Sequence, residues 1–215
     1  MNLNLQRHAL SYVPAAIAAA ALLALAGCAG LSLSTAPDPG VLRVGVTANS
    51  PPMIFKQGKA YAGLEADFAR ALAEKLGRKA VFVDLPWSKL LSGLEEGNVD
   101  VVMSNLTVTR PRAARVDFAD PYLQVGQMAL VHRSDAREFP FGQAVLYTSK
   151  KIGVDEGTTG DLFVQEHCSK AERKPFSSPE KAVRALLSDD IAVFLHDAPV
   201  IWRLAAIHEA DGLVA

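Results

Sequence analysis

The stretch 41–46 reads VLRVGV, and its β-branched and apolar residues are typical of a buried β-strand. A helix is indicated over 64–76, where large apolar residues recur every four positions: Leu64, Phe68, Leu72 and Leu76. Further strands at 80–83 and 100–103 flank a short helix at 87–94. Strands that alternate with helices over so short a span are joined by right-handed crossovers, so these residues predict a parallel sheet with flanking helices.

The same alternation begins again further along the chain. It comprises a strand at 127–131, a polar turn at 132–135, a strand at 151–154, a helix starting near Thr159, a helix at 179–187 and a strand at 191–195. Two such units joined by an extended segment predict an α/β protein of two lobes, which we place at 41–131 and 132–215. Ligands of such sheets bind at the carboxyl ends of the strands and between lobes.

The composition excludes several classes of protein. The 215 residues include 22 Lys and Arg, 23 Asp and Glu and two cysteines, and 50% of them are hydrophobic. The near-zero net charge argues against a general nucleic-acid binder, and the hydrophobic content against a mostly disordered chain. Two cysteines are too few for a disulfide framework or a four-cysteine zinc site. Because nucleotide-binding, metalloprotease and serine-hydrolase motifs are also lacking, we expect neither a metal nor an organic cofactor.

The first residues are typical of a secretory signal peptide, because basic Arg7 precedes an apolar stretch at 9–26 that ends in small residues. The strongly apolar part, 15–26, is shorter than the roughly 20 residues that cross a bilayer. We therefore place a signal peptide at 1–27. Residues 28–40 are rich in Ser, Thr, Pro and Gly, which indicates a flexible tether.

Residues 25–28 read LAGC and resemble, at all four positions, the lipobox of bacterial lipoproteins. The resemblance implies acylation of Cys28 and stable anchoring in a membrane through several acyl chains. Because Ala29 follows, it implies the inner leaflet of the outer membrane in a Gram-negative cell. The alternative is a buried or incidental cysteine after an ordinary signal peptide. A lipidated Cys28 leaves Cys168 without a partner, and we expect a buried structural thiol there.

A first polar segment, 104–112, follows the strand at 100–103 and reads SNLTVTRPR. Thr109 suits the N-cap of a helix and Pro111 its first turn. Arg110 and Arg112 then lie at the helix start, where a positive charge is unfavourable unless an anion binds there.

A guanidinium can grip a carboxylate through two hydrogen bonds, and further donors are at hand in Ser104, Asn105 and Thr107. The segment therefore favours a site for a carboxylate. The alternative is that both arginines are solvated or paired with Asp117 and Asp120.

Two further polar segments follow strands of the second unit. Residues 155–161 read DEGTTGD, where glycines allow close backbone approach and free amides at a helix start attract anions, although an ordinary capped turn would look the same. The pair His196 and Asp197 offers a carboxylate for an ammonium group, or else a cap for a helix beginning near Pro199. Cation, donors and anion together match a zwitterion with one carboxylate and one amine.

Seven short motifs now occur in a familiar order: GLEADF at 63–68, WSKLL at 87–91, GNVD at 97–100, TVTRPR at 107–112, FADPY at 118–122, GTT at 157–159 and HD at 196–197. This series resembles the family 3 extracellular solute-binding proteins, the polar amino-acid receptors of ABC importers. The resemblance begins near Leu42. It implies a periplasmic-binding-protein-like α/β fold of two lobes with mainly parallel sheets and a ligand cleft between them.

The resemblance also implies roles for individual residues. Arg112 is expected to hold the ligand α-carboxylate, with Thr107 and Thr159 as added donors, Asp197 to take the α-amino group, Ser104 and Asn105 to line the floor, and Trp87 to pack on the ligand side chain. Binders of cationic amino acids have an acid where this chain has Thr47 and often an aromatic where it has Ser50, which argues against lysine or arginine. Glu65 replaces a residue that is usually aromatic or Asp.

The implied protein is a monomeric, membrane-anchored receptor in the periplasm. It would capture an amino acid by hinge closure and deliver it to an ABC permease, without catalysis. An enzyme of the same fold, a cyclohexadienyl dehydratase with its acid near Asp161, and a sensory domain without transport are the alternatives. The family fold also returns to the first lobe after the second, and residues 212–215 stop where that return would begin, so we expect a chain truncated at its C-terminus.

Overall fold

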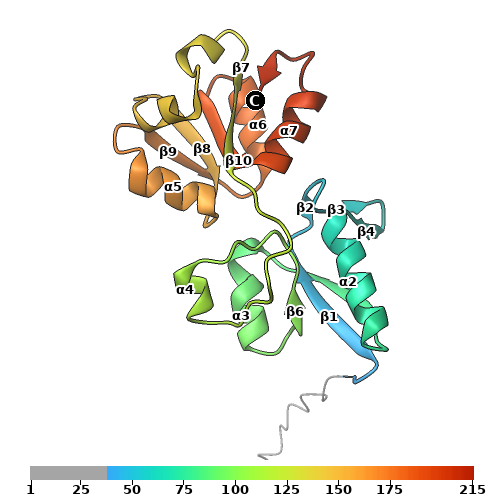
Figure 1. Cartoon of the computed structure of the whole chain (residues 1–215). Helices are drawn as coiled ribbons and strands as arrows, with labels where there is room; N and C mark the ends of the chain where they lie inside the picture. Colours follow the sequence, from blue (N-terminus) through green and yellow to red (C-terminus); the bar gives the residue numbers. More distant parts are fainter. Residues whose placement is uncertain (1–37) are drawn as a thin grey trace, which may run out of the picture. The chain divides into compact units, whose positions relative to one another are not determined.

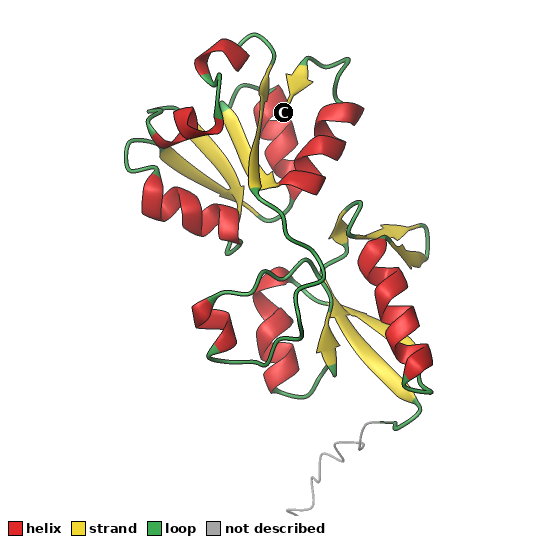
Figure 2. Ribbon diagram, in the orientation of Figure 1, coloured by secondary structure: helices red, strands yellow, loops and turns green. Residues whose placement is uncertain are grey.

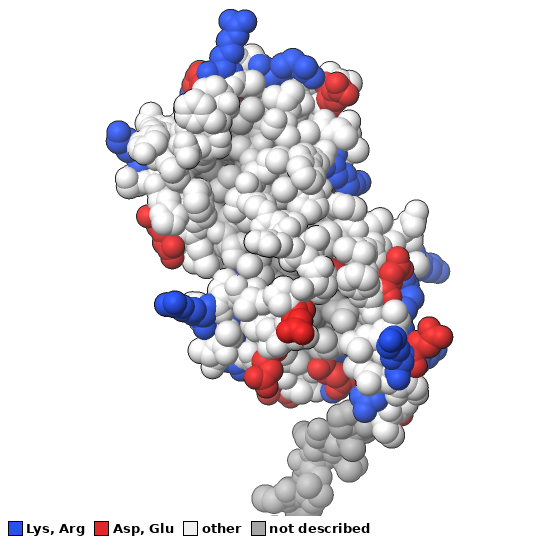
Figure 3. Space-filling view, in the orientation of Figure 1, with Lys and Arg blue, Asp and Glu red and all other residues white. Residues whose placement is uncertain are grey.

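The computed structural model describes residues 38–215. The expected signal peptide, Cys28 and most of the expected tether lie outside the described residues. None of the helices within 38–215 has both the length and the apolar character needed to cross a membrane. On the face shown in Figure 3, Lys and Arg side chains are scattered among Asp and Glu, in keeping with the near-zero net charge.

The first lobe is built on β1 (Val41–Val46), the central strand of a parallel sheet with the order β5-β1-β6. Its partners are β5 (Lys79–Asp84) and β6 (Val101–Val102). Figure 1 shows α2 (Leu64–Lys75) and α3 (Leu90–Glu95) on either side of β1. Because helices cover both faces, β1 reads as a nearly continuous apolar run, and the predicted parallel sheet is confirmed.

Helix α2 lies where the sequence predicted it, but a different face of it is buried. Its alanines Ala66, Ala69 and Ala73 pack with β1 in the core of the first lobe. Leu64 and Phe68, which indicated the helix, remain largely exposed. Small side chains allow the helix to approach the sheet closely, so the alanine stripe faces inward, and Leu72 packs at its margin.

A small antiparallel sheet in the first lobe was not predicted. It consists of β2 (Asn49–Ser50), β3 (Ile54–Gln57) and β4 (Ala60–Ala62), and it links β1 to α2 (Figure 2). The lobe also contains η1 (Trp87–Lys89) and α4 (Arg110–Ala113). Strands of two to four residues carry too little periodicity to be recognised from sequence.

The second lobe has a five-stranded sheet with the order β11-β7-β10-β8-β9. Its strands are β7 (Gln127–His132), β8 (Lys151–Asp155), β9 (Glu172–Phe176), β10 (Val193–Asp197) and β11 (Leu213–Val214). The helices are η2 (Ala136–Glu138), η3 (Gly142–Leu146), α5 (Thr159–His167), α6 (Pro179–Leu187) and α7 (Ala198–Ile207). All five residues of β10 are buried, so the sheet's centre forms the core of this lobe.

Strand β7 corrects the expected boundary between the lobes. Residues 127–131 were assigned to the first lobe, but β7 pairs antiparallel with β10 and with β11. The second sheet is therefore mixed, with β8, β9 and β10 parallel to one another. Hydrophobic periodicity identifies a strand but does not say which strand it pairs with, and this is why the assignment was wrong.

Cys168 is buried in the second lobe, as expected for a structural thiol. It is 3% exposed and packs in a cluster with Val164 and Ile152. Burial raises the pKa of its thiol, which disfavours the reactive thiolate.

Candidate functional site

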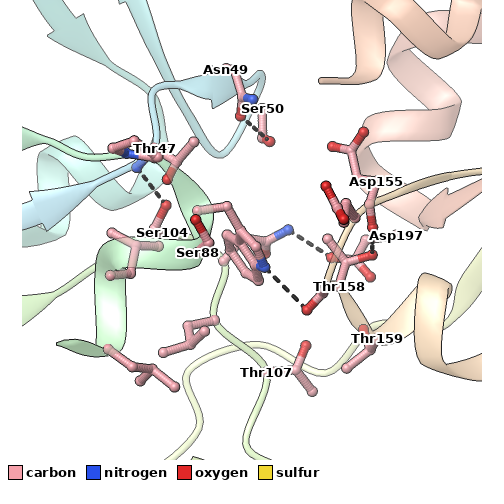
Figure 4. Close-up of a pocket in the computed structure, with 18 of the residues that line it drawn as sticks. Thr47, Asn49, Ser50, Ser88, Ser104, Thr107, Asp155, Thr158, Thr159 and Asp197 are labelled. Carbon is pink, nitrogen blue, oxygen red and sulfur yellow. Dashed lines mark hydrogen bonds between the residues drawn. The ribbon is translucent and has the colours of Figure 1, made fainter. Parts of the chain in front are cut away.

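A cavity of about 610 Å³ lies between the two lobes, at the carboxyl ends of their strands. Thr47 follows β1 and Ser104 follows β6 on one side, while Asp155 ends β8 and Asp197 ends β10 on the other. Figure 4 shows Thr47, Ser88 and Ser104 across the cavity from Asp155 and Asp197. The structure also places the remaining residues expected at a binding site along this cavity: Trp87, Asn105, Thr107, Arg112 and Thr159.

Arg112 is held at the start of α4 by the predicted cap. The Thr109 hydroxyl accepts a hydrogen bond from the Arg112 amide at 3.4 Å, and Pro111 lies in the first turn. The Arg112 guanidinium donates to the Thr107 carbonyl at 2.9 Å and to the Gly157 carbonyl at 3.2 Å. Arg112 therefore bonds to backbone carbonyls and not to Asp117 or Asp120, as the alternative had it.

The Arg112 side chain is a buried cation. It is 8% exposed, and its guanidinium lies 5.3 Å from the centre of the Trp87 ring. Burial lowers the pKa of Arg112, and the negative charge of Asp197 offsets part of that effect. Among residues 38–215, Arg112 forms no ion pair. A buried guanidinium bonded only to neutral carbonyls favours an anion in the cavity.

Asp197 is a buried carboxylate on the opposite lobe, and it is 8% exposed. Its Oδ2 accepts a hydrogen bond from Asn105 Nδ2 at 2.8 Å, and its Oδ1 accepts one from Gln127 Nε2. Asp197 occupies the N-cap position of α7, but its side chain makes no cap hydrogen bond. The alternative that this carboxylate serves to cap the helix is therefore wrong.

Gln127 does not line the cavity, but it contacts two residues that do, and sequence reasoning missed it. Its Nε2 donates to the Asp197 carboxylate and lies 3.3 Å from the Thr159 hydroxyl. It thereby ties the end of β10 to the start of α5. A polar residue at the start of an apolar strand gave no signal that distinguished it from a surface position.

Ser104 and Thr47 join the ends of β6 and β1. The Thr47 amide donates to the Ser104 hydroxyl at 2.8 Å, and the Thr47 hydroxyl donates to the Leu85 carbonyl at 2.8 Å. Ser104 is buried, and Asn105 next to it adopts a positive φ of 56°. These bonds fix the floor of the cavity from the side of the first lobe.

The turn at 155–161 presents a carbonyl to the first lobe, not the amides that we expected. The Gly157 amide donates to Asp161 Oδ2 at 2.8 Å, and the Asp161 amide donates to the Thr158 hydroxyl at 3.3 Å. These amides are satisfied within the turn, as in the alternative of an ordinary capped turn. The Gly157 carbonyl instead accepts hydrogen bonds from Arg112 and, at 3.1 Å, from Trp87 Nε1.

Asp161 is 1% exposed and does not line the cavity. Arg173 pairs with it through two hydrogen bonds, one of them 2.9 Å from Nη2 to Oδ2. Burial raises the pKa of Asp161, but the bonds from Arg173, the Gly157 amide and Gln165 outweigh burial, so that the pKa lies below its ordinary value. Asp161 is therefore held as a carboxylate.

The structure gives Glu65 a role that the sequence did not. The side chain is 1% exposed, and its Oε1 accepts hydrogen bonds from the Asn105 amide and the Tyr122 hydroxyl. Its Oε2 has no hydrogen-bond partner among the described residues. Burial raises the pKa of Glu65, and the bonds from Tyr122 and Asn105 offset only part of this rise. Glu65 thus holds Asn105, a residue of the cavity floor, through its backbone amide.

Replacing Glu65 with Gln is expected to change how stability depends on pH. The folded-state pKa is raised, so the stabilising contribution of Glu65 is present below its unfolded pKa and is lost as the pH rises through the folded pKa. Gln keeps the acceptor oxygen without the charge. In urea denaturation, the free energy of unfolding of E65Q should therefore rise relative to that of the native protein between pH 4 and pH 8, by on the order of 1 kcal/mol.

The matched control is Glu74→Gln, on the exposed side of the same helix, which should give a nearly constant stability difference. A stability difference between E65Q and the native protein that stays flat across this pH range would contradict the assignment of a buried, destabilised carboxylate.

No group of three or more His, Cys, Asp or Glu side chains placed to hold a metal ion occurs in residues 38–215.

Comparison with known proteins identifies the family. The family described as "Bacterial extracellular solute-binding proteins, family 3" matches residues 42–197. The chain belongs to this family. The resemblance noted in the sequence is thereby confirmed, and with it the two-lobed fold with parallel strands in both sheets.

Relatives within the solute-binding family include receptors and an enzyme. A probable histidine-binding protein of Neisseria gonorrhoeae is 30% identical over 214 residues, which cover 94% of this chain and 76% of that protein. The cyclohexadienyl dehydratase of Pseudomonas aeruginosa is 30% identical over 161 residues, covering 72% of this chain and 60% of the enzyme.

Among solved structures, an ancestral amino acid-binding protein described as a precursor of cyclohexadienyl dehydratase is 34% identical with a TM-score of 0.74, covering 81% of this chain and 76% of that one. The fold is therefore shared by binding proteins and by a dehydratase.

Proposed function

We infer that the protein binds an amino acid in the cavity between its lobes and delivers it to an ABC permease. The observation that carries this inference is a buried Arg112 on one lobe, which has no anionic partner among residues 38–215 and faces a cavity whose other lobe presents the buried carboxylate of Asp197. The α-carboxylate of an amino acid suits the guanidinium through charge-assisted hydrogen bonds, and its α-ammonium suits the carboxylate. Membership of the solute-binding family supports the same ligand class.

The neighbouring polar groups fit the same ligand. Thr107 and Thr159 lie along the cavity on opposite lobes and can donate to the ligand carboxylate. Ser104 and Asn105 line the floor, and Trp87 forms a wall beside the guanidinium. Carboxylate oxygens accept more than one hydrogen bond, so Asp197 keeps capacity for an ammonium beside its bonds to Asn105 and Gln127.

Binding is coupled to closure of the lobes in this proposal. Three hydrogen bonds already cross the cleft, from Trp87 to Gly157, from Arg112 to Gly157 and from Asn105 to Asp197. A ligand with both charges is satisfied only where both lobes reach it, so it binds the closed arrangement more tightly and shifts the population toward it. Anchoring through Cys28, a periplasmic location and a monomeric state complete the proposal.

Dehydration is disfavoured by the state of Asp161. A catalytic acid near Asp161 would have to donate a proton to the leaving hydroxyl group of the substrate. Asp161 is instead paired with Arg173, stands outside the cavity lining, and has a lowered pKa. We therefore place binding ahead of cyclohexadienyl dehydratase activity, although an enzyme of that activity is among the relatives.

Thermal unfolding of the purified chain with each of the common amino acids tests the proposal. A ligand at about 100 times its Kd adds about 2.7 kcal/mol, which corresponds to a rise in Tm of about 5–10 °C for a protein of this size. At least one amino acid should give such a rise. If none does, and prephenate is converted to phenylpyruvate instead, the protein is an enzyme and the proposed function is wrong.

A further inference from the structure

Asp155 is a second buried carboxylate in the cavity. It ends β8, is 8% exposed, and lines the cavity beside Asp197 (Figure 4). Its Oδ1 has no hydrogen-bond partner among the described residues, and its Oδ2 lies 3.4 Å from His196 Nε2. Because Oδ1 is enclosed by the protein, a ligand in the cavity would meet this carboxylate at Oδ2, and a buried carboxylate without a cation costs free energy unless a ligand supplies one.

His196 is a buried neighbour of Asp155 at the end of β10. The ring is 6% exposed, and its Nδ1 accepts a hydrogen bond from the Asp197 amide at 2.7 Å. With Nδ1 accepting this bond, the ring turns Nε2 toward Asp155.

The other charges near Asp155 are also negative. Burial raises the pKa of Asp155, the contact with His196 offsets part of the rise, and the charges of Glu180 and Asp197 add to it. No Lys or Arg of residues 38–215 forms an ion pair with Asp155. Within the described part of the chain, this carboxylate thus has no lysine or arginine as a partner.

The charges that line the cavity do not balance. Arg115 is paired with Glu95 through bonds of 2.7 and 2.8 Å, so Arg112 is the one cation of the described cavity lining that is not held by a carboxylate. The buried lining then carries one positive group against two negative ones. A ligand with one carboxylate and one ammonium group supplies partners for Arg112 and Asp197 but none for Asp155.

We propose that Asp155 recognises a second positively charged group on the ligand, and that the ligand is an amino acid with a cationic side chain. This inference rests on the proposed function and specifies the ligand class of the same cavity. Thr47 and Ser50 had argued against such a ligand because they lack charge and aromatic character on the first lobe. In this protein the acid is Asp155 of the second lobe, so the second lobe and not the first recognises the side chain of the ligand.

The size of the cavity agrees with an extended side chain. A volume of about 610 Å³ lies within the range of small-molecule sites and leaves room beyond the α-carbon groups.

Calorimetric titration of two matched ligand pairs tests the proposal. L-Arginine is compared with neutral L-citrulline, and L-lysine with neutral L-norleucine, on the native protein and on Asp155→Asn. The native protein should prefer a cationic member over its neutral partner by about 100-fold, and D155N should lose at least about 30-fold for that cation but less than threefold for the neutral partner. Glu166→Gln, an exposed acid on α5 that does not line the cavity, should change neither.

The possible results separate the two proposals. Tight binding of neutral amino acids with no change in D155N overturns the role of Asp155 and leaves the proposed function standing. Equal weakening of all amino acids in D155N also overturns it, because Asp155 would then act through the shape of the site. Absence of binding by any amino acid overturns both. The Tm of D155N should equal or exceed that of the native protein, since the substitution removes an unpaired buried charge.

Discussion

Replacement of Arg112 with Ala is expected to weaken amino-acid binding by about 100-fold or more. The substitution leaves the ligand carboxylate desolvated in the cavity without a cation, and such a loss costs about 3 kcal/mol or more. Arg112 also donates to the Thr107 and Gly157 carbonyls, so part of the loss comes from a looser cleft. Isothermal titration with the amino acid identified by thermal screening measures the effect.

Arg110→Ala is the matched control, because Arg110 is an exposed arginine of the same short helix. It should bind within about twofold of the native protein, since exposed charges contribute little. Arg112→Lys should recover only part of the affinity, because an ammonium lacks the planar pair of donors. Binding by R112A within about threefold of native would refute the site.

Replacement of Gly63 with Ala is expected to destabilise the protein by about 3 kcal/mol or more, through backbone strain and overpacking together. Gly63 precedes α2 with a φ of 108°, which side chains of L residues rarely adopt. An added Cβ would lie 2.3 Å from the Met53 carbonyl oxygen and 2.7 Å from the Pro52 oxygen. Both are backbone atoms that accept hydrogen bonds from the start of α2, so neither can move freely.

Gly58→Ala separates crowding from strain. Gly58 also has a positive φ, of 63°, but an added Cβ there meets nothing within 4 Å. It should cost about 1 kcal/mol, the ordinary penalty of the left-handed conformation. Urea denaturation of both variants gives the comparison, and equal losses would show that the contact with Met53 is unimportant.

Strands β1, β8 and β10 could be predicted from sequence because most of their residues are buried, whereas β9, a parallel edge strand of exposed and partly buried residues, was not predicted. Val44 and Val46 of β1, or Val193 and Phe194 of β10, are apolar regardless of which side faces the core. The antiparallel position of β7 could not be predicted in the same way, because partner choice depends on long-range contacts that leave no local pattern. The same holds for the burial of Ala66 instead of Leu64 on α2.

The candidate site was partly visible because parallel strands end at one edge, where polar residues such as Ser104 and Asp197 stand out against apolar runs. What the sequence concealed is orientation. The positive φ of 74° at Gly157 helps to turn a carbonyl, and not an amide, toward Arg112 and Trp87. Asp155 lay inside a segment that we interpreted for its glycines and amides, so its place in the cavity lining became apparent only in three dimensions.

The hydrogen bond from Trp87 to the Gly157 carbonyl gives the protein an optical probe of its own. The chain has two tryptophans, and the other, Trp202, is 61% exposed on the second lobe. In the proposed opening, separation of the lobes would break the bond to Gly157 and admit water to the indole of Trp87, while the surroundings of Trp202 would stay the same. Intrinsic fluorescence of a variant in which Trp202 is replaced by phenylalanine is therefore expected to follow the proposed opening and closing in real time, without a label.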